Sequence, residues 1–125
     1  MKFQNEFNYL CALRGATTSE HNSVESITSA VEELLFELVS RNNLIPDQII
    51  SVTFSVTCDL DACFPASIAR KKSGWENIAL LDCQQMFVKD DLSKCIRVLA
   101  CVTLPKKQRP QNPYLGKAKN LRPDR

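Results

Sequence analysis

The sequence is poor in the residues from which most catalytic sites are built. Its 125 residues include one histidine and three glycines, and its six cysteines form no C-x-x-C pair. The lone histidine argues against a zinc site, and so few glycines leave little room for a phosphate-binding loop. His21 lies in a polar stretch beside a helix start, where we expect a solvated side chain and not a general base. We therefore expect neither a metal site nor a cofactor.

Long apolar runs and a large net charge are absent as well. No stretch approaches the roughly 18 apolar residues of a membrane-spanning helix, and the polar first residues do not resemble a signal peptide. The net charge of +2 creates no strong field that would attract nucleic acid or a membrane surface. These absences predict a cytoplasmic protein with neither of those partners. Its cysteines, at positions 11, 58, 63, 83, 95 and 101, are expected to be reduced core residues.

The length and composition suit one globular domain. A hydrophobic fraction of 44% over 125 residues is enough for one core, so we expect a single domain, residues 1–125. Residues 1–8 are interpreted as an N-terminal extension. Residues 105–125 are expected to form an extended tail and no helix, because four of the six prolines lie there.

The hydrophobic periodicity predicts a mixed α/β (α+β) fold. Apolar residues from Val24 to Leu38 recur at spacings of three and four, which predicts one long helix capped by Asn22 or Ser23. A short helix is expected at residues 66–72, and strands at residues 7–13, 49–56, 78–81 and 95–104. One long helix cannot cover both faces of a sheet of four or five strands. The uncovered face predicts a homo-oligomer in which sheets pack together.

Arginine occurs within two of the predicted strand regions. Arg97 lies inside the apolar run of residues 96–102, and Arg14 follows the first apolar strand. A guanidinium stays ionised in proteins and is costly to bury without an anion. The two arginines therefore suggest a pocket for a small anion, although Arg97 on an edge strand could instead reach water along its stem. Cys95, beside Lys94, is the nearest candidate for a nucleophile and has core packing as its alternative.

Six short motifs occur in order along the chain. They are Leu13-Arg14-Gly15-Ala16-Thr17-Thr18, Phe64-Pro65-Ala66 with Arg70, Ser73-Gly74-Trp75, Gln84 with Met86, Lys94-Cys95-Ile96-Arg97-Val98, and Leu121-Arg122-Pro123-Asp124. Together these motifs closely resemble those of the monofunctional chorismate mutases of the trimeric α/β type. The resemblance runs from about Tyr9 to Arg125.

The resemblance implies a fold and a reaction. Enzymes of this type are pseudo-α/β-barrel homotrimers with a mixed sheet of about five strands per subunit, one long and one short helix, and active sites in the clefts between subunits. They convert chorismate to prephenate, a Claisen rearrangement that feeds phenylalanine and tyrosine synthesis. Because no group passes to or from the protein, the reaction needs no histidine, metal or nucleophile. The two carboxylates of chorismate explain a need for several arginines.

The resemblance also implies roles for individual residues. Arg97 would contact the ether oxygen of the breaking bond and the side-chain carboxylate, where a fixed cation stabilises the negative charge of the transition state. Arg14 and Tyr114 match positions that bind carboxylate, in a pocket that holds the substrate in a compact pseudo-diaxial shape. The remaining matches are Arg70 near the cleft mouth, Phe64 and Ala66 in the pocket wall, Leu80 and Leu81 beside the substrate, and Leu121 and Arg122 in a tail that folds over the site.

Three positions depart from the pattern that the resemblance implies. A glutamate of the family is replaced by Gln85, a cysteine by Asp82, and a lysine beside the pocket wall by Ser67, where weaker substrate binding is expected. Our hypothesis is that Asp82 supplies the missing carboxylate: it accepts the hydrogen bond of the ring hydroxyl and balances Arg97, while Gln85 stays as a neutral partner. The alternative is that Asp82 ends a strand and caps the following turn.

Two other functions remain open alongside the predicted chorismate mutase. A non-catalytic trimer that binds chorismate or a similar dicarboxylate would fit the loss of glutamate at Gln85. Nucleic-acid binding by the basic tail is the weaker alternative, because Tyr114 is the one aromatic residue of that tail and stacking surfaces usually carry several.

Overall fold

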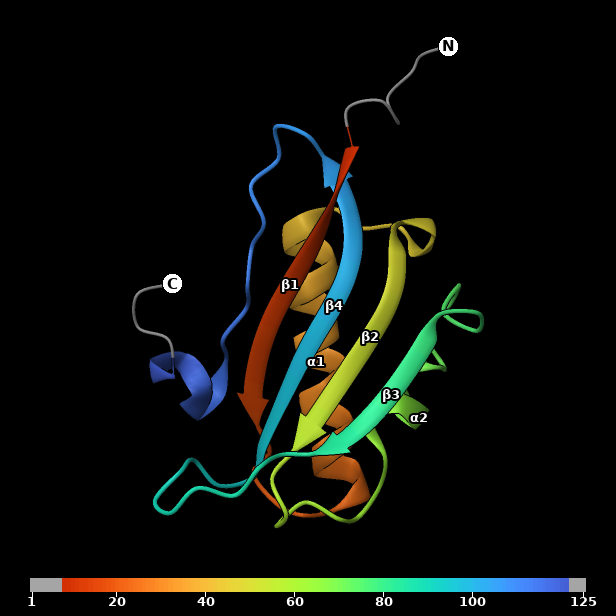
Figure 1. The fold of residues 1–125 in the computed structure, drawn as a ribbon. Helices are drawn as coiled ribbons and strands as arrows, with labels where there is room; N and C mark the ends of the chain where they lie inside the picture. The colour runs from red at the N-terminus through yellow and green to blue at the C-terminus, as the bar shows by residue number, and fades with distance from the viewer. Residues whose placement is uncertain (1–7, 122–125) are drawn as a thin grey trace.

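The sheet that organises the molecule contains four strands. The computed structural model describes residues 8–121, and its strands are β1 (Asn8–Thr18), β2 (Ile49–Val56), β3 (Ala79–Gln84) and β4 (Cys95–Pro105). Their order in the sheet is β1-β4-β2-β3 (Figure 1). β4 pairs antiparallel with both β1 and β2, whereas β3 pairs parallel with β2. β4 is therefore a central strand and β3 an edge strand.

Two helices cover one face of the sheet, which we call the helix face. They are α1 (Val24–Asn42) and α2 (Pro65–Ala69), and both lie behind the sheet in the view of Figure 1. Two short 3-10 helices are η2 (Pro46–Gln48) and η3 (Gly116–Asn120). The opposite face, which neither α1 nor α2 covers, we call the open face. No helix in the described part of the chain is long and apolar enough to span a membrane.

The predicted α+β class is confirmed, but the predicted strands need correction. Residues 8–121 contain four strands and not about five. β1 continues to Thr18 instead of ending at residue 13, and β3 continues to Gln84 instead of residue 81. Arginine and glycine suggested the end of a strand, yet the ladder with β4 extends to the pair Thr18–Cys95. Pairing with a neighbouring strand outweighs weak local strand preference.

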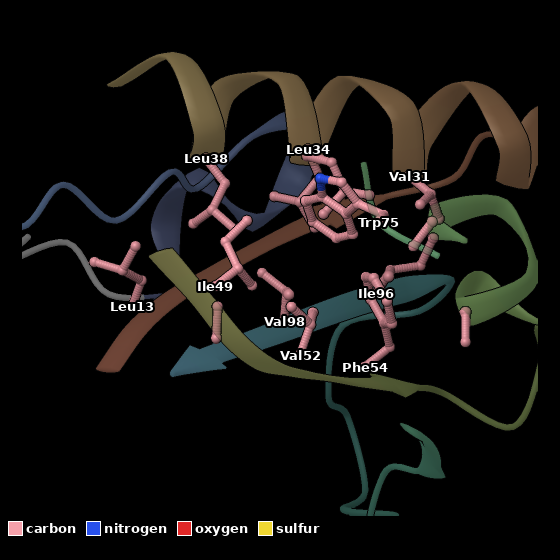
Figure 2. Close-up of a cluster of buried hydrophobic side chains, with 14 of the residues drawn as sticks. Leu13, Val31, Leu34, Leu38, Ile49, Val52, Phe54, Trp75, Ile96 and Val98 are labelled. Atoms are coloured by element: carbon pink, nitrogen blue, oxygen red, sulfur yellow. The ribbon is translucent and has the colours of Figure 1, made fainter. Parts of the chain in front are cut away.

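The apolar stripe of α1 packs on the helix face, as predicted. The side chain of the N-cap Ser23 accepts a hydrogen bond from Ser26 N at 3.1 Å, and the helix ends at Asn43, whose φ of 51° is left-handed. Each large apolar side chain in this layer contributes roughly 1.5–3 kcal/mol by leaving water. The core drawn in Figure 2 contains Leu13, Val31, Leu34, Leu38, Ile49, Val52, Phe54, Trp75, Ile96 and Val98.

Strand alternation gives the open face a different set of side chains. In β4, Arg97 and Leu99 point to the open face, while the buried Val98 and Ala100 point to α1. Arg14 of β1 pairs with Leu99 and shares its face. Leu99 is 49% exposed, so apolar surface remains uncovered beside the arginines, as the sequence predicted.

The tail departs from the prediction of a purely extended segment. It runs beside β1, where Ala16 N donates to Pro113 O at 3.0 Å and Leu115 N donates to Ala16 O at 2.8 Å. A Cβ on Gly15 would approach Pro113 O to 2.7 Å, so the glycine permits this close passage. The tail then forms η3, because residues 116–120 contain none of its prolines.

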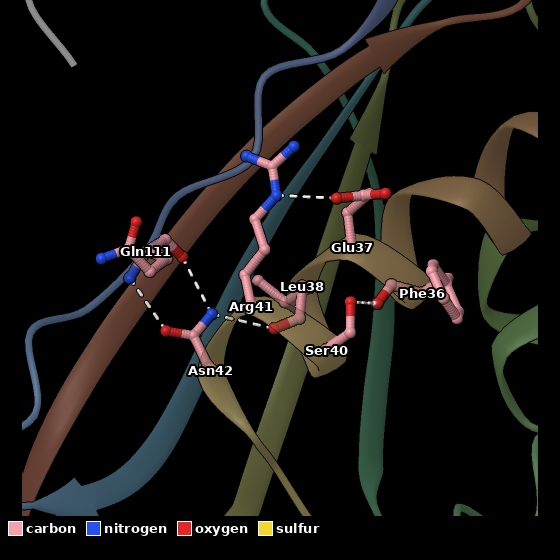
Figure 3. A network of polar contacts seen from close by, with 7 residues as sticks. All are labelled: Phe36, Glu37, Leu38, Ser40, Arg41, Asn42 and Gln111. Atoms are coloured by element: carbon pink, nitrogen blue, oxygen red, sulfur yellow. Dashed lines mark hydrogen bonds and ion pairs between the residues drawn. The ribbon is translucent and has the colours of Figure 1, made fainter.

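Asn42, fully buried at the end of α1, fastens the tail to the rest of the molecule (Figure 3). Its Nδ2 donates to Leu38 O at 2.8 Å and to Gln111 O at 2.9 Å, and its Oδ1 accepts from Gln111 N at 2.8 Å. Gln108 Nε2 donates to Asn42 O at 2.8 Å. These hydrogen bonds fix the segment that leads to Tyr114, which bridges to Ala16 of β1.

The cysteines fit the prediction of reduced core residues only in part. All six are free, and Cys95 is buried. The prediction is wrong for Cys58, which lies in the loop after β2, and for Cys83, which lies on the open face of the edge strand β3, because both are exposed. The immediate neighbours of both residues are polar, Thr57 and Asp59 around Cys58 and Asp82 and Gln84 around Cys83.

Candidate active site

Three of the predicted site residues line one pocket on the open face. Arg14, Arg97 and Tyr114 share a hollow of about 390 Å³ with residues of β2, β3 and β4. The side chain of Arg97 is 39% exposed, so the guanidinium is partly withdrawn from water. The alternative of an edge-strand arginine is wrong, because β4 lies between β1 and β2. The predicted anion pocket thus has two guanidinium groups and a phenol in its wall.

An acidic residue outside the predicted set lies beside Arg97. Asp91, in the loop between β3 and β4, has its Oδ2 at 3.8 Å from Arg97 Nη2. The same oxygen accepts a hydrogen bond from Gln85 Nε2 at 2.9 Å. In the sequence, Asp91 belongs to a polar turn, and no periodic pattern reveals where a loop side chain points. The place of Asp91 in the site was therefore not predictable from the sequence.

Two buried polar atoms at this point have no hydrogen-bond partner. Within the described residues they are Gln85 Oε1, an acceptor, and Arg97 Nε, a donor. Buried polar atoms in proteins are nearly always paired, so each unpaired one requires an explanation. A ligand that offers both a hydroxyl and an anionic oxygen would satisfy the two atoms together.

A second group of predicted site residues lies on the helix face, around α2 and β3. The register pairs Asp82 with the buried Phe54, so the two side chains share this face. Asp82 Oδ1 accepts a hydrogen bond from Ala66 N at 3.0 Å, at the start of α2. Burial raises the pKa of Asp82, although Ala66 N–H and the charge of Arg70 act in the opposite direction.

The structure separates the two groups of predicted site residues. Because Asp82 and Arg97 point to opposite faces of the sheet, Asp82 does not balance Arg97 of the same chain. Asp82 also caps the start of α2, an earlier element, and not the turn that follows its strand. Phe64, Ser67 and Arg70 are exposed near α2 and Ala66 is buried there, while Leu80 shares the face of Asp82 and Leu81 lies on the open face.

Cys95 lacks the properties of an activated nucleophile. It is fully buried, and burial raises the pKa of its thiol even though Arg97 acts to lower it. Cys95 packs in a small cluster with Ala16 and Ala118, against which Tyr114 and Leu121 lie. The tail thus brings Leu121 to the same side of the molecule as Arg97. Arg122 lies outside the described residues.

Comparison with known proteins matches almost the whole chain. Residues 10–125 match the family described as chorismate mutase type I. The chain belongs to the type I chorismate mutase family. A chorismate mutase AroH of Bacillus subtilis (strain 168) is 38% identical over 114 residues, which cover 90% of this chain and 89% of that protein. A chorismate mutase AroH of Thermus thermophilus is 37% identical over 114 residues, which cover 90% and 93%.

A solved structure agrees with these relatives. The chorismate mutase from Clostridium thermocellum superposes with a TM-score of 0.79 at 40% identity, covering 87% of this chain and 97% of that one. The resemblance read from six motifs is therefore confirmed. The chain is a chorismate mutase, an isomerase that converts chorismate to prephenate in aromatic amino acid biosynthesis.

Proposed function

We propose that chorismate reacts between two copies of the chain, in a pseudo-α/β-barrel homotrimer to which each copy contributes a different group of side chains. One copy supplies Arg14, Arg97 and Tyr114 from its open face. A neighbouring copy supplies Phe64 and Arg70 from beside α2. Because these groups belong to opposite faces of one sheet, a single chain does not assemble them around one substrate. The exposed apolar side chains of the open face supply surface for the contact between copies.

In this site Arg97 stabilises the transition state. As the bond between carbon and the ether oxygen lengthens, negative charge collects on the oxygen, and a fixed guanidinium favours that state over the ground state. The buried, unpartnered Nε of Arg97 is a donor that remains available for this oxygen. This free donor, in a pocket that also contains Arg14, is the observation that carries the proposal.

Two groups are candidates for the ring hydroxyl of the substrate. Gln85 Oε1 is buried without a partner, so it is a ready acceptor beside Arg97. Asp82 is the other, and it would have to come from the neighbouring copy because it lies on the helix face of its own chain. The hypothesis that Asp82 accepts this hydrogen bond thus becomes a proposal about the contact between copies.

The other residues hold the substrate in its compact shape. Arg14 and Tyr114 bind one carboxylate, and Arg70 attracts the substrate at the cleft mouth. Holding the two reacting ends together converts binding energy into rate, because the pseudo-diaxial conformer no longer has to be found by chance. The pocket wall and closing tail comprise Phe64, Ala66, Ser67, Leu80, Leu81, Leu121 and Arg122.

The proposed setting is the cytoplasm, without a cofactor or a further partner. Six free thiols fit a reducing compartment. The rearrangement transfers no group, so it needs only chorismate and other copies of the chain.

Mixing two variants of impaired activity tests the shared site. Arg97→Ala and Arg70→Ala remove residues from different groups, so co-refolding equal amounts should leave about one site in four intact in randomly mixed oligomers. Chorismate consumption, followed by its absorbance, should recover accordingly. Arg97→Ala mixed with Arg14→Ala is the control, because both residues come from the same copy and no site becomes intact. Equal recovery in both mixtures, or a monomer by light scattering, would contradict the shared site.

A further inference from the structure

We propose that Asp91 is the positioning residue of this site: its carboxylate holds Arg97 and Gln85 in the orientations that the rearrangement needs. This inference rests on the proposed function of Arg97. Among residues 8–121 there are two ion pairs, and Arg97–Asp91 is the one that does not lie within α1. Arg97 also shares its pocket with Arg14. Without a nearby anion, two guanidinium groups in one partly buried pocket would repel each other.

The carboxylate of Asp91 is itself held in place. Its Oδ1 accepts a hydrogen bond from Leu92 N at 2.7 Å, and Asp91 N donates to Val88 O at 3.1 Å. Leu92 packs against the cluster of Ala16, Cys95 and Ala118. The backbone around Asp91 is thereby tied to the body of the molecule, although it belongs to a loop. Its Oδ2 remains for Gln85 and Arg97.

Two further aspartates, Asp59 and Asp82, bind other groups. Both carboxylate oxygens of Asp59 accept a hydrogen bond from Lys94 N, at 3.1 Å and 2.9 Å. Asp59 also accepts a hydrogen bond from the Thr57 hydroxyl. These bonds fix the end of the loop where β4 begins. Asp82 points to the helix face and binds Ala66 N. Among residues 8–121, Asp91 is therefore the carboxylate that faces Arg97.

Gln85 and Arg97 each use one polar atom to bind Asp91 and keep another polar atom unpaired. Gln85 gives its amide nitrogen to Asp91, which leaves Oε1 as an acceptor. Arg97 directs Nη2 toward Asp91, which leaves Nε as a donor. By binding both side chains, Asp91 orients Gln85 Oε1 as an acceptor for a hydroxyl. It also orients Arg97 Nε as a donor for an oxygen that becomes anionic. Asp91 does this without touching the substrate, so it acts on the rate through orientation.

Asp91→Asn compared with Asp90→Asn tests the proposal in the full-length protein. Both variants remove one negative charge from adjacent positions. Asp90 has a φ of 67°, which asparagine tolerates, and it makes no ion pair within the described chain. Asp91→Asn should lower kcat for chorismate by about 100-fold while KM changes much less. Asp90→Asn should match the wild type. Equal kcat values for both variants would overturn the proposal.

Exchanging the carboxylate of Asp91 with the amide of Gln85 distinguishes a positioning role for Asp91 from a loss of folding in Asp91→Asn. The double variant Gln85→Glu with Asp91→Asn moves the carboxylate to position 85 and keeps one hydrogen bond between the residues. It should recover most of the kcat lost in Asp91→Asn. No recovery, with circular dichroism and thermal unfolding like the wild type, would show that charge beside Arg97 is not what matters. A wild type without turnover would refute the proposed site instead, and so distinguishes the two failures.

Discussion

The two faces of the sheet use the same strands for different purposes. On the helix face, Phe54, Leu34 and Leu38 are fully buried and form the core. On the open face, the residues on either side of the buried Val98 in β4 are Arg97, partly exposed, and Leu99, 49% exposed. Burial of side chains on the helix face stabilises the fold. The open face instead leaves apolar side chains exposed and polar atoms without a partner. Because side chains alternate between the two faces of a sheet, successive residues of one strand can serve the core and the active site in turn.

The largest expected effect is on the helix face. Phe54→Ala should lower the free energy of unfolding by about 3–5 kcal/mol, because it leaves a cavity under α1. Chemical denaturation followed by circular dichroism measures this loss. At a temperature where the variant stays folded, its kcat should equal that of the wild type. A large fall in kcat of the folded variant would mean that the two faces are not separate.

The next effect is on the open face and has the opposite character. Arg97→Ala should lower kcat/KM by about 100- to 1,000-fold, equivalent to about 2.7–4 kcal/mol of transition-state stabilisation, since it removes the cation at the ether oxygen. The free energy of unfolding should change little. Arg41→Ala is the control, because Arg41 forms an exposed ion pair with Glu37 on α1 and should affect neither quantity strongly. Equal kcat/KM for the two variants would remove Arg97 from the mechanism.

The smallest effects separate two aspartates by the sign of their pH dependence. Burial raises the pKa of Asp82, so its charged form is disfavoured in the folded state. The wild type should therefore lose stability, relative to Asp82→Asn, as pH rises from below the unfolded pKa of about 3.9 through the raised folded value. If Asp82→Asn also leaves kcat/KM unchanged, Asp82 does not bind the ring hydroxyl.

Asp59 should behave in the opposite way. Burial alone would raise the pKa of Asp59, but hydrogen bonds from the Thr57 hydroxyl and Lys94 N–H lower it below its ordinary value. Its stabilising contribution is present above the unfolded pKa and is lost as pH falls through the folded pKa. Asp59→Asn should therefore be less stable than the wild type at neutral pH and approach it in acid. Urea unfolding of both variants across the acidic range measures the two signs, and parallel curves would contradict them.

Local sequence patterns were sufficient to predict the main helices and strands. The spacing of apolar residues in α1, the β-branched run of β2 and the arginine inside β4 are properties of neighbouring residues, which the sequence displays directly. Six motifs identified the family, because their order and spacing can be read from the sequence without knowledge of the fold. That Arg14 and Arg97 lie on one side depends on the register of β1 with β4, which pairs Arg14 with Leu99.

The folded arrangement was needed for relations between elements that lie far apart in the sequence. Strand register set Asp82 on the face opposite Arg97, and a loop without periodicity brought Asp91 to Gln85 and Arg97. The length of β1 was likewise fixed by its pairing with β4. Periodicity tells which residues share a face, but hydrogen bonding between distant segments selects which face, which partner and which carboxylate. For that reason the sequence alone was enough to predict the cation Arg97, whereas the tertiary structure was needed to find its anion, Asp91.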